Sequence, residues 1–242
     1  ELQRRANRIA NVLVRDMGLV PGNRVLLRAP NNPMLVACWF AVIKAGAIAV
    51  ATMPLLRAKE LKAIIDIGRI THALCDASLA DELRLASSSL ELRLFNTSGQ
   101  GSLEAAMQHH DAPFVTIDTA ADDTCLMAFT SGTTGRVKGA VLSHRNLITG
   151  LMSVQLAGMQ VLHGTAARLG IPVEAMMQHM PQQAALLVYP LFHISGLGSA
   201  FLSPMLAGSK VVVMRRWDAP RALDYIRDEQ VTMFTGVPTM LW

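Results

Sequence analysis

The sequence predicts an α/β fold with mostly parallel sheets covered by helices. Short apolar segments, typical of strands buried on both faces, alternate along the chain with segments of helical periodicity. That alternation is typical of parallel sheets. The chain also has 242 residues, of which 51% are hydrophobic, and this is enough to bury a sizeable core.

The first portion of the chain, about residues 1–122, opens with an amphipathic helix. Between residues 1 and 17 apolar side chains recur at steps of three and four, which places them on one helical face. A turn at residues 20–23 (VPGN) follows. A strand, a helix and a second apolar strand then predict a βαβ unit with parallel strands. The predicted elements after the turn are, in order, a strand at 25–27, a helix at 33–45, a strand at 47–52, a helix at 59–67, a strand at 72–75, a helix at 81–85, a strand at 92–95 and a short helix at 103–108.

The segment 34–56 has the length and the low charge of a membrane-spanning helix. Its pattern nevertheless favours a helix followed by a strand, because Asn32 and Pro33 are a typical N-cap and first-turn pair. Lys44 lies in the expected last turn and Gly46 just beyond it, where a helix ends. We therefore expect no transmembrane segment here, and no hydrophobic run of a secretory signal follows the first residues.

The second portion, about residues 123–242, contains the remaining predicted elements. Ser143 can cap a long amphipathic helix that begins at His144, and Asp218 ahead of Pro220 begins another helix. The predicted strands lie at 124–130, 138–142, 185–189, 211–214 and 231–234, and a loop of Gly, Ser and Thr joins the first two.

The charge, the cysteines and the histidines indicate which partners, which compartment and which metal to expect. The chain has 22 Lys and Arg residues and 18 Asp and Glu residues, which gives a net charge of +4. Because the basic residues are scattered along the chain, nucleic acid is not an expected partner. The three cysteines, Cys38, Cys75 and Cys125, are far apart in apolar surroundings. They predict buried thiols in a reducing compartment, and we expect a cytoplasmic protein. The pair His109-His110 has no second ligand at metal-binding spacing, so no zinc site is predicted.

The most informative segment is FTSGTTGRVKG, residues 129–139. Its glycines and small hydroxyl residues leave backbone N–H groups exposed, Ser and Thr add O–H donors, and Lys138 adds a cation, which together predict a phosphate-binding loop. A flexible linker is the plain alternative, but this segment lies between two strand-like segments. The loop of nucleoside triphosphatases is excluded, because that pattern has Ser or Thr after its lysine and here Gly139 follows Lys138.

Two segments closely resemble the signatures of the adenylate-forming superfamily, which includes acyl-CoA synthetases, aryl-CoA ligases, peptide-synthetase adenylation domains and luciferases. The first is TSGTTG at 130–135, followed by Lys138-Gly139 and by SHRNL at 143–147. The second, PLFHISG at 190–196, resembles the segment at the acyl and nucleotide pocket of the acyl- and aryl-CoA ligases, which narrows the class. The resemblance covers nearly the whole chain. It implies that residues 1–242 are part of the large N-terminal AMP-binding domain, with the mobile C-terminal domain and its adenylating lysine outside this chain.

The resemblance also implies roles for individual residues. Thr130 would help to hold Mg²⁺ and the phosphates of ATP, and Lys138 would neutralise phosphate charge as a point cation. His193 would lie beside the reacting carboxylate and the nucleotide, where it could orient the acid or donate to the α-phosphate. Without that context, a lone histidine in an apolar run is more often a core residue. The residues that would wrap the β- and γ-phosphates are Ser131, Gly132, Thr133, Thr134 and Gly135.

Two features depart from the family pattern. Val137 stands where the family usually has proline, which loosens the loop without removing a hydrogen-bond donor. Extra sequence at about 162–183 carries Met176, Met177 and Met180 at helical spacing. This stretch could form an adaptable apolar lid, although such stretches more often fill a core or an interface.

The implied reaction is the ATP-dependent activation of a carboxylic acid to acyl-AMP, followed by transfer of the acyl group to CoA. We expect a medium- or long-chain fatty acid as the substrate. The alternatives are a benzoate- or cinnamate-like acid, a nucleotide-binding homologue without ligase activity, and a purely structural α/β domain. The elements that bind adenine and ribose in the family cannot be found in this chain, so we expect this chain alone not to turn over. Peripheral membrane contact would be compatible with a fatty-acid ligase, but no clear basic amphipathic helix supports it.

Overall fold

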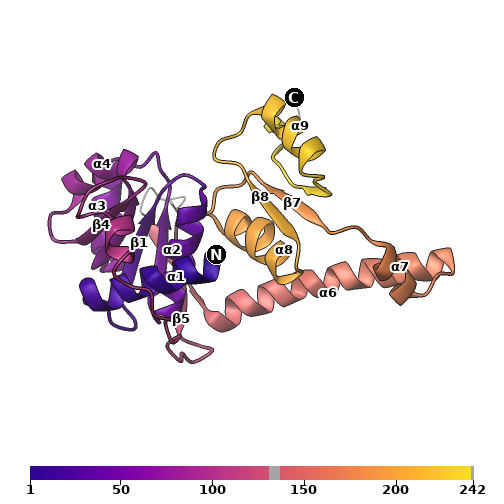
Figure 1. The fold of residues 1–242 in the computed structure, drawn as a ribbon, viewed down its shortest axis with the longest axis horizontal. Coiled ribbons are helices and arrows are strands. Elements are labelled where there is room, and N and C mark those ends of the chain that lie inside the picture. Colours follow the sequence, from indigo (N-terminus) through magenta and orange to yellow (C-terminus); the bar gives the residue numbers. More distant parts are fainter. Residues whose placement is uncertain (131–136, 241–242) are drawn as a thin grey trace. The chain divides into compact units, whose positions relative to one another are not determined.

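The computed structural model describes residues 1–130 and 137–240 and divides into two compact units (Figure 1). The first unit runs from Glu1 to Arg145 and the second from Asn146 to Trp242. Each unit has its own sheet and its own helices. The predicted α/β class with mostly parallel strands is therefore confirmed.

The first unit is built on a six-stranded sheet in the order β4-β3-β1-β2-β5-β6. β1 pairs in parallel with β2 and β3, β3 pairs in parallel with β4, and β2 pairs in parallel with β5, as predicted for strands joined through helices. β6 runs antiparallel to β5. The strands are β1 (Arg24–Arg28), β2 (Ile48–Thr52), β3 (His72–Asp76), β4 (Glu91–Phe95), β5 (Thr124–Thr130) and β6 (Lys138–Ser143).

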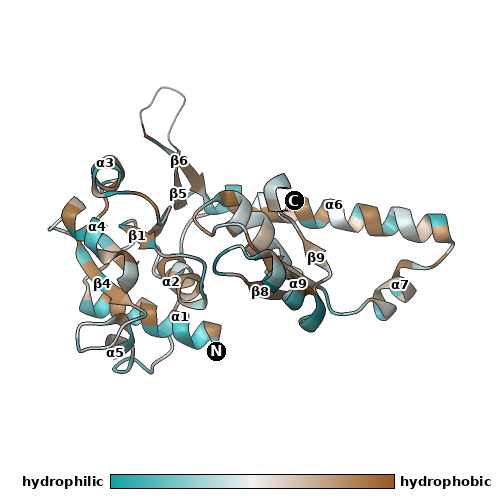
Figure 2. Ribbon diagram, turned by 90° about the horizontal axis from the view of Figure 1, so that it is seen from above, coloured by the Kyte–Doolittle hydropathy of each residue, from teal (hydrophilic) through white to brown (hydrophobic). Residues whose placement is uncertain are grey.

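The helices of the first unit largely follow the signals in the sequence. The Oδ1 atom of Asn32 accepts a hydrogen bond of 2.8 Å from the Leu35 N–H, and Pro33 is in the first turn, so the predicted start of α2 is confirmed. The predicted helix over residues 1–17 is regular only as far as Asn11 and then widens into a π-type segment, Val12–Asp16. Both hydrophilic and hydrophobic residues are visible along α1 in Figure 2, as expected of an amphipathic helix. The helices are α1 (Leu2–Asn11), α2 (Pro33–Lys44), α3 (Ala58–Gly68), α4 (Ala80–Ala86) and α5 (Leu103–Met107).

No helix within residues 1–130 and 137–240 is both long enough and apolar enough to cross a membrane. The segment 34–56, which has the length of a spanning helix, forms α2 and β2 as predicted. Lys44 ends α2, and Gly46 just beyond it has a φ of 67°, a left-handed conformation that favours glycine.

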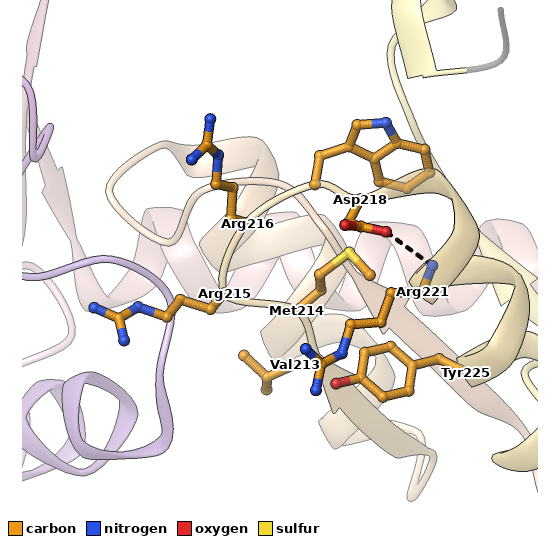
Figure 3. A pocket seen from close by; sticks show the side chains of 8 residues that line it. Val213, Met214, Arg215, Arg216, Asp218, Arg221 and Tyr225 are labelled. Atoms are coloured by element: carbon orange, nitrogen blue, oxygen red, sulfur yellow. Dashed lines mark hydrogen bonds between the residues drawn. The ribbon is translucent and has the colours of Figure 1, made fainter.

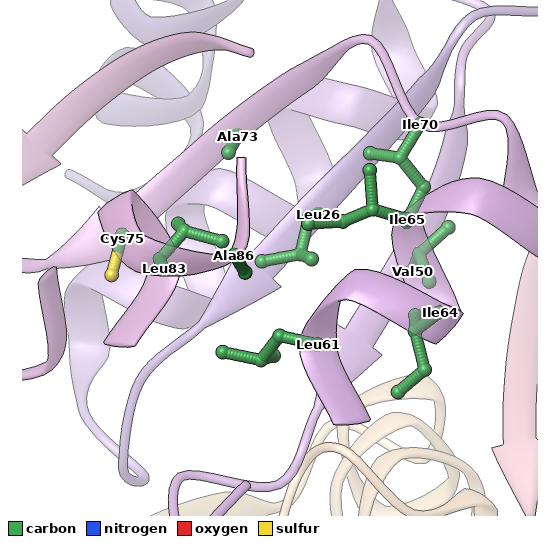
Figure 4. Packing of buried hydrophobic residues seen from close by; sticks show 10 residues of the cluster. All are labelled: Leu26, Val50, Leu61, Ile64, Ile65, Ile70, Ala73, Cys75, Leu83 and Ala86. Carbon is green, nitrogen blue, oxygen red and sulfur yellow. The ribbon is translucent and has the colours of Figure 1, made fainter. Parts of the chain in front are cut away.

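A cluster of ten buried apolar side chains forms the core between the sheet and the helices α3 and α4 (Figure 4). Met127, Phe129 and Val137 are partly buried and pack against this cluster. The core therefore extends to the two strands that flank the predicted phosphate loop. The ten residues are Leu26, Val50, Leu61, Ile64, Ile65, Ile70, Ala73, Cys75, Leu83 and Ala86.

All three cysteines are buried and free, as their apolar surroundings predict. Burial raises the pKa of the Cys75 thiol to about 12 and that of the Cys125 thiol to about 11. Burial also raises the pKa of Cys38. These residues are therefore neutral thiols that belong to the core, and none of them is an activated nucleophile.

Arg28, the last residue of β1, is a buried cation that no pattern in the sequence indicates. The residue is 1% exposed, and burial lowers its pKa. Because the partners of its guanidinium group come from the segments that follow β2 and β3, this side chain ties together the carboxyl ends of neighbouring strands. The guanidinium donates hydrogen bonds to the carbonyl oxygens of Met53 (3.0 Å), Pro54 (3.0 Å), Leu56 (2.8 Å) and Leu79 (3.3 Å).

The second unit is built on a three-stranded parallel sheet in the order β8-β7-β9. The carboxylate of Asp218 accepts a hydrogen bond of 2.9 Å from the Arg221 N–H, and Pro220 is in the first turn, so the predicted start of α9 is confirmed. Leu186, Val188, Met214 and Ala222 form the core of this unit. Its elements are α6 (His144–Leu169, which begins at the end of the first unit), α7 (Val173–His179), β7 (Ala184–Leu187), α8 (Ser203–Leu206), β8 (Lys210–Val213), α9 (Ala219–Asp228) and β9 (Met233–Phe234).

Two elements of the second unit differ from the prediction. The strand predicted at 231–234 is limited to Met233–Phe234, because the Val231 N–H bonds to the Ile226 carbonyl at 3.1 Å and completes the end of α9. A helical segment that is not evident in the sequence consists of a π-type helix, Ser195–Leu202, followed directly by α8. Glycine and serine are poor helix formers, so local propensity gives no signal for this segment.

Candidate active site

The predicted phosphate loop joins two antiparallel strands, β5 and β6. Thr130 is the last residue of β5, Lys138 is the first residue of β6, and the two lie directly opposite each other in the sheet register. Residues that are directly opposite in antiparallel strands have their Cβ atoms about 4.5–5.5 Å apart and their side chains on the same face. A hydroxyl and an ammonium group, both on exposed residues, therefore flank the two ends of the loop. Ser131, Gly132, Thr133, Thr134 and Gly135 lie outside the described residues.

The base of this loop is fixed by packing on the core of the first unit. Val137 packs on the apolar cluster together with Phe129. The side chain that replaces the usual proline of the family therefore contributes apolar contact at the end of the loop. Gly139 lies opposite Phe129, and a Cβ atom built on it would come within 3.2 Å of the Phe129 ring and of the Met127 side chain. Glycine thus allows the aromatic ring to lie close against the backbone beside Lys138.

His193 lies in a turn that follows β7. The turn is held by a hydrogen bond of 3.1 Å from the His193 N–H to the Pro190 carbonyl and by one of 2.9 Å from the Leu197 N–H to the His193 carbonyl. The His193 side chain is exposed, so it is not the core histidine that an apolar run would otherwise indicate.

The hydrogen bonds of the His193 ring indicate its tautomer. Its Nδ1 atom lies 2.8 Å from the Ser195 hydroxyl oxygen and accepts a hydrogen bond of 3.3 Å from the Ser195 N–H. Because Nδ1 accepts, the assigned tautomer carries its proton on Nε2. No described residue bonds to Nε2, which is thus available as a donor toward a ligand.

Gly196 fixes the shape of this turn. It is buried, and a Cβ atom built on it would lie 2.0 Å from the Pro190 carbonyl oxygen. Every other residue type would therefore collide with backbone, whereas a Cβ atom at Gly198 would meet only the Ile194 side chain at 3.6 Å. Small residues follow His193 in the sequence, but the sequence contains no local signal of this close approach.

The structure brings together Thr130 and Lys138 in the first unit and determines the surroundings of His193 in the second. Met176 and Met177 lie on α7, and Met180 follows it directly. The described residues contain no group of three or more His, Cys, Asp or Glu side chains that could hold a metal ion.

The residues present fit ATP better than they fit a metal ion held by protein ligands alone. Lys138 and the Thr130 hydroxyl suit phosphate oxygens. Mg²⁺ in nucleotide sites usually keeps several waters and takes phosphate oxygens as ligands, with only one or two ligands from the protein. The Thr130 hydroxyl is suitable as one such ligand.

Comparison with known proteins shows the family. The sequence model of the family described as AMP-binding enzyme matches residues 1–242. A feruloyl-CoA synthase from Amycolatopsis sp is 32% identical over 250 residues, covering 99% of this chain and 43% of that protein. A long-chain-fatty-acid–CoA ligase from Salmonella typhimurium is 24% identical, covering 99% of this chain and 46% of that protein.

A similar solved structure is that of ATP-bound MatB from Rhodopseudomonas palustris. It has a TM-score of 0.80 and 28% identity, and the match covers 99% of this chain and 44% of that chain. This chain therefore spans less than half the length of each of these three proteins. By its fold, its motifs and its match over residues 1–242, the chain belongs to the family of AMP-binding enzymes.

Proposed function

We propose that the whole protein joins a carboxylic acid to CoA, using ATP and passing through an acyl-adenylate. The observation that carries this proposal is the placement of Thr130 opposite Lys138 at the two ends of the loop SGTTGR, in a chain of the AMP-binding family. The solved MatB structure, which has ATP bound, supports ATP as the nucleotide.

In the first step, a carboxylate oxygen of the acid attacks the α-phosphorus of ATP, and the bond to the departing pyrophosphate breaks. Negative charge shifts onto the pyrophosphate oxygens as this bond breaks, so fixed donors and cations lower the barrier. Lys138 would neutralise part of that charge, while Thr130 and the backbone and hydroxyl donors of residues 131–135 would hold the β- and γ-phosphates. Bound Mg²⁺, with the Thr130 hydroxyl as a ligand, would supply further charge neutralisation.

The role proposed for His193 concerns the acid and the α-phosphate. Its Nε2–H is the ring donor that is left for a ligand, because its Nδ1 atom is engaged by Ser195. That donor can orient the acid or bond to an α-phosphate oxygen as charge develops there. In the second step the CoA sulfur forms a bond to the acyl carbon, the thiol proton is lost, and AMP leaves with the electrons of the acyl–oxygen bond.

The proposal has two candidate classes of acid. A medium- or long-chain fatty acid agrees with the long-chain-fatty-acid–CoA ligase among the relatives. A second candidate, an aromatic acid of the cinnamate type, is favoured by the feruloyl-CoA synthase, which has the higher identity of the two.

The test is exchange of labelled pyrophosphate into ATP by the full-length protein with a panel of acids. We expect exchange to depend on the acid, and the preference for chain length or for an aromatic ring to identify the substrate class. Replacing Lys138 by Ala should slow exchange by about tenfold to a thousandfold, the range for loss of one charged contact to a transition state. The matched control is Lys62→Ala, because Lys62 is an exposed lysine on α3 that pairs with Asp66 at 2.8 Å. ATP binding without exchange for any acid would instead identify a nucleotide-binding homologue.

A further inference from the structure

The side chain of His193 is exposed, so its orientation depends on hydrogen bonds more than on packing. An exposed side chain moves among several rotamers unless something fixes it. Within the described part of the chain, the ring bonds to Ser195, whose backbone N–H lies 3.3 Å and whose hydroxyl oxygen lies 2.8 Å from Nδ1. A group that must donate to a reacting phosphate loses much of its effect when it is misplaced by about 1 Å. The contact with Ser195 therefore bears on the proposed reaction.

The Ser195 N–H needs an acceptor, because Ser195 is the first residue of the π-type helix that ends at Leu202. The first N–H groups of a helix have no carbonyl partner within that helix, so side chains often accept from them. An oxygen of Asn32 does this at the start of α2, at 2.8 Å, and an oxygen of Asp218 does it at the start of α9, at 2.9 Å. Figure 3 shows the second of these bonds as a dashed line. After His193, the acceptor is the imidazole nitrogen Nδ1.

The Ser195 hydroxyl must then donate to the same nitrogen. An imidazole nitrogen without a hydrogen accepts, whereas a protonated one only donates. If Nδ1 carried a proton, it would face the Ser195 N–H, and two donors would point at each other. The hydroxyl can rotate to either role, so the backbone N–H decides which role it takes. At 2.8 Å the hydroxyl is the shorter of the two contacts, and together they keep the ring in the tautomer that carries its proton on Nε2.

His72 shows how a histidine with a structural role differs. It is buried, its Nδ1 atom lies 2.7 Å from the Thr71 hydroxyl oxygen, and its Nε2 atom lies 2.9 Å from the Met17 carbonyl oxygen. Both ring nitrogens of His72 are thus occupied by the protein. In His193 a hydroxyl occupies Nδ1 in the same way, but Nε2 has no described partner and the residue is exposed. Ser195 therefore fixes one side of an imidazole ring whose other side is open to a ligand.

We propose that Ser195 is a positioning residue for the first step of the reaction and that it acts by holding His193 as a neutral Nε2–H donor. This inference rests on the proposed ligase function. The hydroxyl and the N–H of Ser195 fix the plane and the tautomer of the ring before the substrates bind. No reorganisation of the ring is then needed when negative charge develops on the acid or the α-phosphate. His193 gives a hydrogen bond in this role and keeps its proton.

The first test measures pyrophosphate exchange by the full-length protein. Ser195→Ala removes the hydroxyl and leaves the backbone N–H, so the rate at saturating ATP and acid should fall about threefold to tenfold, as expected for loss of one orienting hydrogen bond. The KM of ATP should change by less than about twofold, because the lost effect belongs to the transition state. Ser195→Thr keeps a hydroxyl and should recover most of the rate. The matched control, Ser199→Ala, changes an exposed serine of the same helix and should keep the wild-type rate.

A double-mutant cycle distinguishes a positioning role from a merely structural one. In a His193→Ala background the ring is absent, so adding Ser195→Ala should change the rate by less than about twofold. An equal effect of Ser195→Ala with and without His193 would overturn the proposal, because the serine would then act independently of the ring. A wild-type rate in Ser195→Ala would overturn it as well.

Nitrogen NMR of the full-length protein with isotope-labelled histidine determines the tautomer without any substrate. The signals of His193 are those that disappear in His193→Ala. At about pH 8, where an ordinary imidazole is neutral, the wild type should show a protonated Nε2 and an unprotonated Nδ1. A protonated Nδ1 in the wild type would contradict the proposal. Absence of exchange by the wild type would refute the ligase function instead, while the NMR spectrum still tests the contact between Ser195 and His193.

Discussion

Gly196→Ala should disrupt the His193 turn much more than Gly198→Ala, although both glycines lie in the same π-type helix, Ser195–Leu202. A Cβ atom at Gly196 would lie 2.0 Å from the Pro190 carbonyl oxygen and 2.6 Å from its carbon. Real Cβ atoms essentially never approach closer than 3.0 Å, so the backbone would have to move by about 1 Å. No flexible side chain can absorb this movement, because the opposing atoms belong to the backbone.

The loss of stability expected for Gly196→Ala has two sources, overpacking and a weakened hydrogen bond. Overpacking in a closed site costs about 1–3 kcal/mol. A backbone shift would also weaken the hydrogen bond from the His193 N–H to the Pro190 carbonyl, worth about 1 kcal/mol. We expect a loss of about 3 kcal/mol in the free energy of unfolding. Gly198→Ala meets only ordinary contact at 3.6 Å and should be neutral or stabilise by about 0.5–1 kcal/mol, since alanine is the better helix former.

Urea denaturation of the two variants and the wild type measures these differences. The same proteins should be compared in pyrophosphate exchange at a temperature at which all remain folded. Because the turn positions His193, Gly196→Ala should also slow exchange, and Gly198→Ala should not. Equal stability of the two variants would show that the close approach to Pro190 is not a constraint, and the account of this turn would then be wrong.

Three further predictions concern the framework. Replacing Arg28 by Met should destabilise the fold by about 3 kcal/mol or more, because buried carbonyl oxygens lose their donors, whereas Arg84→Met, at an exposed position of α4, should change the urea midpoint little. Asn32→Ala should cost about 1 kcal/mol through loss of the α2 cap, and Asn32→Asp, which keeps an acceptor, should retain most of the stability. Thiol reagents at pH 8 should label Cys75 and Cys125 only after unfolding, and rapid labelling of the native protein would contradict this. The pKa values of both thiols in the folded protein lie above the unfolded value of 9.0, so the free energy of unfolding should decrease as the pH rises from 9 toward 11–12.

Local signals were sufficient for much of the framework. The caps at Asn32 and Asp218 are short-range features in which a side chain bonds to a backbone group three residues ahead, so sequence shows them directly. Arg28 could not be identified as buried, because its carbonyl partners come from segments 25 to 51 residues further along the chain. The helical segment at 195–206 was missed for a related reason, since a glycine that is unfavourable for a helix is required there by contact with Pro190.

In the candidate site, too, local sequence signals identify some features, whereas others depend on contacts in the folded chain. The motif at 130–138 predicts which residues meet phosphate, and the strand pattern on either side is enough to anticipate that Thr130 and Lys138 approach each other. The close approach of Gly196 to the Pro190 carbonyl, which shapes the turn of His193, has no local signal because the contact exists only in the folded turn.

The direction of β6 explains why Lys138 carries so much of the proposed chemistry. In nucleotide sites where the phosphate loop opens a helix, the helix N-terminus supplies partial positive charge and converging N–H groups. Here the residues after the loop form an antiparallel strand, and the next helix begins only at His144. Sheets have only a small net dipole, so a hairpin offers phosphate no comparable field. In the proposed reaction the charge of ATP is met by Lys138, by the donors of the loop and by a bound divalent cation, and the sheet register puts Lys138 opposite Thr130, whose hydroxyl is proposed as a ligand of that ion.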